Sequence, residues 1–98
     1  MKVVEYLPEA LNELHAAASY HEAKVPKYGA RFLNDAERTC EILQEFPLFG
    51  RELDDVFRRV NLPSFPYFFA YVIRGDRIII AAVSHSSRHP DYWKDRIP

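Results

Sequence analysis

The sequence predicts one α+β domain over residues 1–98, in the order β-α-α-β-β-β, with a helical hairpin packed on one face of a twisted antiparallel sheet. Three observations predict this fold. Apolar residues recur at helical spacing up to about residue 46, and after residue 55 the chain becomes rich in β-branched and aromatic residues. A length of 98 residues, with 48% hydrophobic and 28% charged residues, suits a single globular domain.

A short strand and a first helix are expected at the start. Lys2–Tyr6 is a β-type run, and Pro8 followed by Glu9 marks a helix start, because proline is tolerated at the first helical position and an acid suits the helix dipole. The helix runs to about Lys24, where Val25-Pro26 breaks it. Its apolar residues recur at helical spacing: Ala10, Leu11, Leu14, Ala17 and Ala18.

A second helix is expected from about Lys27 to Phe46, ended by Pro47. Its apolar stripe consists of Tyr28, Phe32, Ala36, Cys40 and Leu43. The short link makes the two helices an antiparallel hairpin, which buries both stripes. Cys40 is the only cysteine, so an internal disulfide is impossible, and its place on the stripe predicts a small core residue.

Three strands are expected in the second half: Val56–Leu62, Tyr67–Arg74 and Arg77–His85. Gly75-Asp76 is a two-residue hairpin loop that fixes the register of the last two strands. In that register Tyr71 faces Ile80, Phe69 faces Ala82, and Tyr67 faces Ser84. One face then carries Tyr67, Phe69, Tyr71, Ile78 and Ile80, and the other carries Phe68, Val72, Ile79, Val83 and His85. Both faces are apolar and the hairpin covers only one, so the other is expected to form a concavity or to meet a partner.

The charges are unevenly distributed. Net charge is −1, but residues 1–55 hold six Lys/Arg against eleven Asp/Glu, whereas residues 56–98 hold seven against three. The basic second half indicates either a cationic face with a function or ordinary solvation. Met1–Tyr6 has no long apolar stretch, so we expect no signal peptide, and Ile78–Val83 is far shorter than the ~20 residues that span a bilayer. A cytoplasmic protein without membrane partners is therefore expected.

The strong signatures of cofactor and metal sites are missing. The three glycines lie far apart, so there is no phosphate-binding loop, and there is no Cys-x-x-Cys pair. His85 and His89 are four residues apart on a strand end, too few ligands for a typical zinc site. We therefore expect neither a metal nor a cofactor. His15 and His21, on the first helix among polar neighbours, are expected at the surface.

One C-terminal cluster mixes guanidinium, imidazole and aromatic groups: Arg58, Arg59, His85, Arg88, His89, Tyr92, Trp93 and Arg96. Such groups bind phosphate or carboxylate, transfer protons, or stack on bases and partners. Each also has a structural alternative. Arg58 and Arg59 point to opposite sheet faces, Trp93 is expected to pin the tail to the sheet, and His85 to bond locally at the strand end.

Several segments, taken in order, resemble the RelE/ParE toxin superfamily. Arg58-Arg59-Val60-Asn61-Leu62, then Phe65-Pro66-Tyr67 and Tyr71, resemble its "RR..L..FPY...Y" stretch. Ala82-Val83-Ser84-His85, Arg88, Pro90, Tyr92-Trp93 and Arg96 resemble its "AV.H..R.P.YW..R" ending, and Phe46-Pro47 with Gly50 resembles its helix-to-strand link. The resemblance covers nearly the whole chain and implies the toxin of a type II toxin–antitoxin pair, neutralised by a cognate antitoxin.

The superfamily divides on mechanism, and the resemblance leaves three readings. ParE-like plasmid-stabilisation toxins inhibit DNA gyrase and need no hydrolytic residues. RelE-like toxins are ribosome-dependent mRNA endoribonucleases, for which His85 would be the acid/base and Arg59 and Arg88 the phosphate clamps. A third reading is a non-toxic member of the fold that only binds a partner. The binding residues are expected to be Arg58, Tyr67, Tyr71, Tyr92, Trp93 and Arg96.

The charge pattern favours the ParE-like reading. No lysine lies between Lys27 and Lys94, whereas several ribosome-dependent nucleases carry a lysine-rich strand region. The isoelectric point of about 6.4 is low for a protein that docks in ribosomal RNA, where affinity comes from neutralising phosphates. We therefore predict a gyrase inhibitor, with the ribosome and mRNA as alternative partners.

Overall fold

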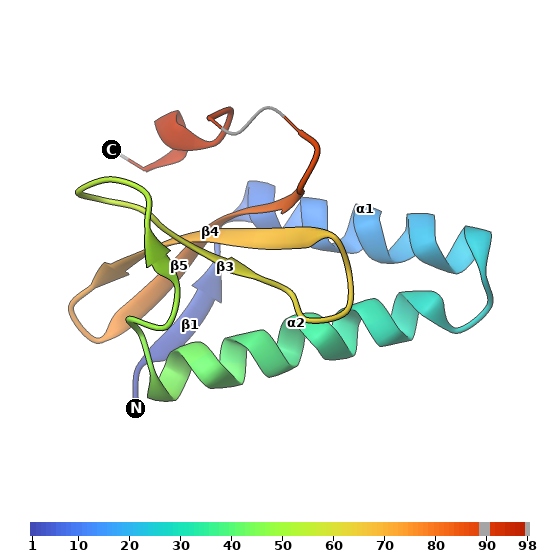
Figure 1. Cartoon of the computed structure of the whole chain (residues 1–98), viewed down its shortest axis with the longest axis horizontal. Helices are drawn as coiled ribbons and strands as arrows, with labels where there is room; N and C mark the ends of the chain where they lie inside the picture. Colours follow the sequence, from blue (N-terminus) through green and yellow to red (C-terminus); the bar gives the residue numbers. More distant parts are fainter. Residues whose placement is uncertain (89–90, 98) are drawn as a thin grey trace.

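Two helices pack against a five-stranded sheet in the computed structural model of this chain, which describes residues 1–88 and 91–97 (Figure 1). The predicted α+β fold is confirmed. The elements are β1 (Val3–Tyr6), α1 (Pro8–Lys24), α2 (Tyr28–Glu45), β2 (Arg51–Glu52), β3 (Arg58–Asn61), β4 (Tyr67–Arg74), β5 (Arg77–His85) and a short 3-10 helix, η1 (Lys94–Arg96).

The strand order in the sheet is β1-β5-β4-β3-β2. The predicted sheet differs in two details. It is mixed rather than wholly antiparallel, because β1 runs parallel to β5 and fills the edge that the β4–β5 hairpin leaves open. A two-residue edge strand, β2, which was not among the predicted strands, also forms between α2 and β3, because its backbone pairs with the first half of β3.

The link between α1 and α2 is held by one carboxylate. Lys27 precedes α2 in the left-handed conformation, with φ 75°. The Glu22 side chain accepts hydrogen bonds from the backbone N–H groups of Lys27 and Gly29, both at 3.0 Å, and so caps the start of α2. A Cβ on Gly29 would lie 2.8 Å from the carbonyl oxygen of Ala18. Glycine therefore allows the two helices to approach closely at this end of the hairpin.

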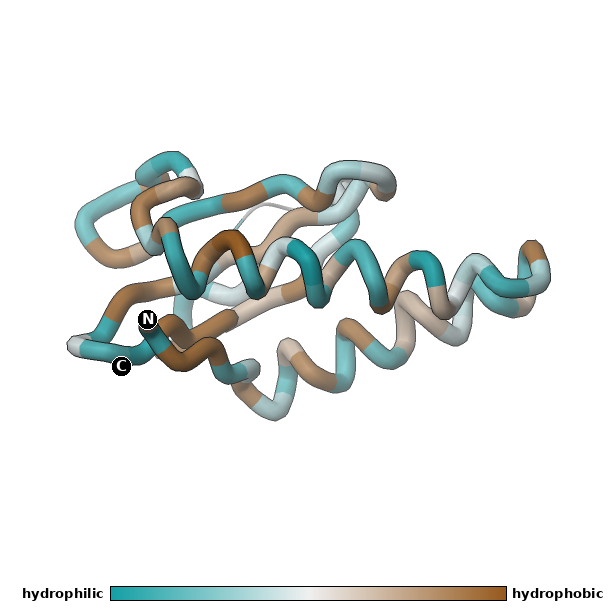
Figure 2. The backbone as a smooth tube through the Cα atoms, turned by 90° about the horizontal axis from the view of Figure 1, so that it is seen from below, coloured by the Kyte–Doolittle hydropathy of each residue, from teal (hydrophilic) through white to brown (hydrophobic). Residues whose placement is uncertain are grey.

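The larger core lies between the helices and the sheet. α1 contributes alanines and Leu14, and α2 contributes Phe32, Ala36 and Leu43. The sheet contributes Phe69, Tyr71, Ile78 and Ile80, among others. Figure 2 shows the apolar stretches of the strands running behind the two helices. Burial of these apolar side chains stabilises the packing of the two helices against the sheet.

The second face of the sheet is covered by the chain itself. Trp93, only 1% exposed, packs there with Phe57, Phe68 and Val72, while Tyr92 and Ile97 pack at the margin. Figure 1 shows the C-terminal segment, in red, on the side of the sheet opposite α2. The prediction of an open concavity on this face is therefore wrong, and the expectation that Trp93 pins the tail to the sheet is confirmed.

A register shift changes which side chains share a face. From the turn as far as Tyr71–Ile80 the predicted register is confirmed, but an irregularity between Ala70 and Tyr71 then pairs Phe69 with Val83 and Tyr67 with His85. The expected pairs with Ala82 and Ser84 are wrong by one residue. Since each one-residue slip exchanges the faces of a strand, Val83 and His85 lie on the helix side, not on the opposite face.

No helix in the described part of the chain is long and apolar enough to cross a membrane.

Candidate functional site

A groove opens where β5 continues past the end of β1. β1 ends at Tyr6, opposite Ile80, so no strand of the described residues adjoins the last part of β5 on that side. α1 runs beside it instead, and the space between them holds about 230 Å³. The groove is lined by Glu13, Ala16, Ala17, Tyr20, Tyr67, Val83, His85 and Arg88, and we call it the α1–β5 groove.

Glu13, which lines this groove, is the centre of a hydrogen-bond network. Its carboxylate accepts hydrogen bonds from the backbone N–H of Val83 at 3.0 Å and the Tyr92 hydroxyl at 2.8 Å. It also forms a two-pronged ion pair with the Arg96 guanidinium, at 3.0 and 3.1 Å. Arg96 in turn donates to the carbonyl oxygen of Ala81 at 2.9 Å. These two side chains thus satisfy backbone groups on the open edge of β5 and attach the C-terminal segment to α1.

Two arginines flank the ring of Tyr92. The Arg88 guanidinium carbon lies 4.3 Å from the ring centroid, and that of Arg96 lies 5.1 Å away. Arg88 is exposed, whereas Arg96 is held by Glu13, and that hydrogen bond raises the pKa of the Arg96 guanidinium above its ordinary value. Burial raises the pKa of the Tyr92 phenol. Of these two cations, Arg88 is therefore the one that is exposed to solvent.

The His85 imidazole also lines this groove. Its ring packs edge-on against Tyr67, with centroids 5.1 Å apart. The backbone N–H of Ser87 donates to Nδ1 at 3.0 Å. The Ser87 hydroxyl also lies 2.7 Å from Nδ1. The structure thus brings His85 and Arg88 together, and the predicted local bonding of His85 is confirmed.

Arg59, the third group of the ribonuclease set, lies on the other face of the sheet. It pairs with Ala70 across β3 and β4, and its guanidinium carbon is 3.8 Å from the ring centroid of Phe68. His85 pairs with Tyr67 and faces the helices. The structure therefore does not bring Arg59 and His85 to one site, as phosphodiester cleavage by this trio requires.

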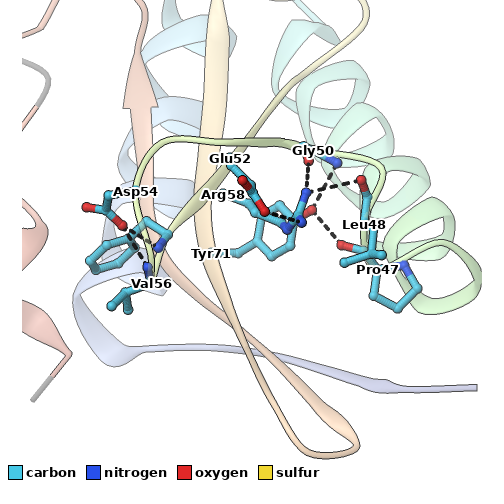
Figure 3. A network of polar contacts seen from close by, with 9 residues as sticks. Pro47, Leu48, Gly50, Glu52, Asp54, Val56, Arg58 and Tyr71 are labelled. Atoms are coloured by element: carbon cyan, nitrogen blue, oxygen red, sulfur yellow. Dashed lines mark hydrogen bonds and ion pairs between the residues drawn. The ribbon is translucent and has the colours of Figure 1, made fainter.

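Arg58 and Tyr71 hold the loop that follows α2 (Figure 3). The buried Tyr71 hydroxyl donates to the Pro47 carbonyl at 2.7 Å and accepts from the Gly50 N–H at 2.9 Å. Arg58 donates to the Gly50 carbonyl at 2.7 Å and pairs with Glu52 at 3.1 Å. As predicted, Arg58 and Arg59 face opposite sides of the sheet. Both Arg58 and Tyr71 stabilise the fold in this arrangement.

The predicted binding residues thus differ in their accessibility. Tyr71 and Trp93 are buried in the two cores, whereas Tyr67, Tyr92, Arg58 and Arg96 are each half-buried. His89, also in the predicted cluster, lies outside the described residues.

Sequence reasoning missed two residues of α1. Glu13 stands beside Leu14 on the helix, and an acid next to an apolar stripe is the signal that could have identified it. His15 is exposed as expected, but His21 is not a simple surface residue: its ring packs against Phe32 and Phe65, with centroids 5.3 and 5.0 Å away. Burial, and then the charge of His85, lower the pKa of His21.

Comparisons with known proteins agree with this architecture. A family model described as the ParE toxin of the type II toxin–antitoxin system parDE matches residues 4–90. The chain is also similar to a solved structure described as the chromosomal ParDE TA system from P. aeruginosa, with a TM-score of 0.75 and 18% identity, covering 87% of this chain and 96% of that one. At that identity the likeness concerns the fold alone. No curated protein matches the chain significantly.

Proposed function

The chain belongs to the ParE toxin family of type II toxin–antitoxin systems, and from this premise we propose that it inhibits DNA gyrase by protein contact and is neutralised by a cognate antitoxin. The family match over residues 4–90 is the observation that carries the proposal. The separation of Arg59 from His85 across the sheet supports it, because the ribonuclease alternative requires those groups at one phosphate.

The surface proposed for these contacts is the α1–β5 groove together with the adjoining ring of Tyr92 and its two arginines, Arg88 and Arg96. It combines an exposed guanidinium, Arg88, with half-buried aromatic rings of Tyr67 and Tyr92, the residue types that dominate binding energy at protein interfaces. Arg96 lies beside the Tyr92 ring, and Arg58, on β3, is proposed as a separate contact residue away from this groove.

Two assays test the function. Expression of the chain without its antitoxin is expected to stop growth, and co-expression of the antitoxin to restore it. With purified gyrase and relaxed plasmid, the chain is expected to reduce supercoiling or to trap cleaved plasmid. Primer extension on cellular messages is expected to show no codon-phased cuts. Normal growth would favour the non-toxic partner-binding alternative, and codon-phased cuts would establish the ribonuclease.

The site is tested by charge reversal. Arg88→Glu is expected to weaken binding to gyrase or to the antitoxin, because it replaces the exposed cation of the groove with an anion. Arg74→Glu is the matched control, since Arg74 is also exposed but lies at the far end of β4, by the hairpin turn. Equal effects of the two substitutions would refute a specific role for the groove.

A further inference from the structure

The edge of the sheet places two arginines directly opposite each other. Arg51 on β2 pairs with Arg59 on β3, so the two side chains share one face. Like charges in directly opposed positions destabilise a sheet. Their proximity, after burial, lowers the pKa of the Arg59 guanidinium below its ordinary value. This arrangement carries an electrostatic penalty within the chain that an anion would relieve.

Neighbouring cations have acidic partners, whereas these two have none among residues 1–88 and 91–97. Arg58, one residue away on the other face, pairs with Glu52 at 3.1 Å. Lys94 pairs with Asp54 at 3.5 Å, and Asp54 also accepts two backbone N–H groups. Glu52 and Asp54, two acids close to this pair along the chain, are thus already engaged. The Arg51–Arg59 pair remains uncompensated in the part of the chain that the structure describes.

Arg59 is held in a fixed orientation. Its guanidinium stacks on the ring of Phe68, at 3.8 Å, and its Nε donates to the Asn61 side-chain oxygen at 3.1 Å. Stacking engages the face of the guanidinium, so the terminal N–H groups remain as donors in its plane. Since the Asn61 oxygen faces Nε, its NH₂ group supplies further donors beside them. Little side-chain entropy remains to be lost when a ligand binds.

We propose that Arg51, Arg59 and Asn61 form a binding site for carboxylate side chains of the antitoxin. The inference rests on the proposed function. Carboxylate and phosphate both suit paired N–H donors, but affinity for nucleic acid requires many free cations along a strand, and the neighbouring cations Arg58 and Lys94 are already paired with Glu52 and Asp54. The site lies at the open sheet edge, where β2 has only two residues. An extended antitoxin segment can pair with that edge and place its acidic side chains on this face.

The direct test uses two defined probes on the full chain. A hexaglutamate peptide and a single-stranded hexathymidylate are each titrated while the Arg Nε–H signals are followed by NMR. We expect the peptide to shift the Arg59 signal in a saturable manner and the oligonucleotide to shift it less. A larger shift with the oligonucleotide, or no shift with either probe, would overturn the proposal.

Whether the antitoxin binds at Arg51, Arg59 and Asn61 is tested with the antitoxin encoded beside this chain's gene. Arg51→Gln with Arg59→Gln is expected to weaken antitoxin binding by about 10- to 100-fold, the loss typical of charge-assisted hydrogen bonds. Arg74→Gln is the control and is expected to leave affinity unchanged. Arg51→Gln alone changes an exposed side chain, so it remains folded, and should show part of the loss. Unchanged affinity in the double variant would overturn the proposal. If the chain does not arrest growth, the proposed function is refuted. A saturable shift of the Arg59 signal with the peptide would still support carboxylate binding at this site.

Discussion

Tyr71 is the residue on which the loop between α2 and β3 depends. Its hydroxyl is buried, donates to Pro47 and accepts from Gly50, so one oxygen satisfies two backbone groups of that loop. A Cβ on Gly50 would lie 2.6 Å from the same oxygen, which explains why the loop needs glycine there. Leu48 and Phe49, whose apolar side chains are exposed, therefore lie on a loop whose backbone is held by the hydrogen bonds of Tyr71.

Tyr71→Phe is therefore expected to lower the free energy of unfolding by about 1–3 kcal/mol, because it leaves a buried donor and a buried acceptor without partners. Urea denaturation measures the change. Tyr67→Phe is the matched control, because no described residue forms a hydrogen bond with its hydroxyl, and it should change stability much less. Equal effects would show that the Tyr71 hydroxyl does not support the loop.

His21 predicts a dependence of stability on pH. Its pKa in the folded chain lies below the ordinary value of 6.5, so the unfolded chain binds the proton more readily. Stability is therefore greatest above that pH and decreases as the pH falls through about 6.5. Unfolding in urea at pH 7.5 and 5.5 should show a smaller difference for His21→Leu than for the unchanged protein. His15→Gln changes an exposed position and should keep the full difference in stability between the two pH values. If His21→Leu also keeps the full difference, a group other than His21 is responsible.

At the scale of elements, the open edge of β5 is completed by side chains rather than by a strand. Glu13 from α1 accepts a hydrogen bond from the Val83 N–H, and Arg96 from the C-terminal segment donates one to the Ala81 carbonyl. Glu13 and Arg96 also form an ion pair, and their side chains are only 17% and 18% exposed. One ion pair therefore joins a helix, a strand edge and the segment that carries Trp93.

A double-mutant cycle with Glu13→Gln and Arg96→Gln is expected to give a coupling free energy of about 1–2 kcal/mol, because the pair is largely shielded from water. The single tryptophan, Trp93, reports attachment of the segment by the wavelength of its fluorescence. Lys94 and Asp54 form a control pair whose side chains are 41% and 39% exposed, and their coupling should stay below about 1 kcal/mol. Equal coupling in both pairs would remove the special role of Glu13.

Local signals predicted the elements but not how some of them combine. Pro8, Val25-Pro26 and Gly75-Asp76 fix helix and turn positions through backbone geometry, which any short window of sequence reveals. The run Ile78–Val83 is apolar in both phases, so nothing local selects the slip that turns Val83 and His85 toward the helices. The pairing of Glu13 with Arg96 joins residues 83 positions apart, and only the packed fold brings them together.

At the scale of the whole molecule, the sheet is covered on both faces, by the helices and by the C-terminal segment. Trp93 is the largest side chain of the second core. Its indole Nε1 is buried without a hydrogen-bond partner among residues 1–88 and 91–97, so its contribution is one of packing.

Trp93→Ala is expected to lower the free energy of unfolding by about 3–5 kcal/mol, as for other large aromatic residues removed from cores. Trp93→Phe should be milder, because it keeps a ring and removes the unpartnered N–H. Phe46→Ala, at a position 61% exposed, is the control and should change stability by less than about 0.5 kcal/mol. Circular dichroism in urea measures all three, and a small loss for Trp93→Ala would mean that the second core is dispensable.

The parallel pairing of Val3 with Arg77 has a consequence for synthesis. A ribosome adds about 5–20 residues per second, so β1 emerges several seconds before the strand that it joins. During that interval the paired helices have no sheet to cover their apolar sides, and neither β5 nor the groove beside it exists. On the proposed function, a nascent copy of this protein therefore lacks the groove proposed for partner contacts until almost the entire chain has been translated.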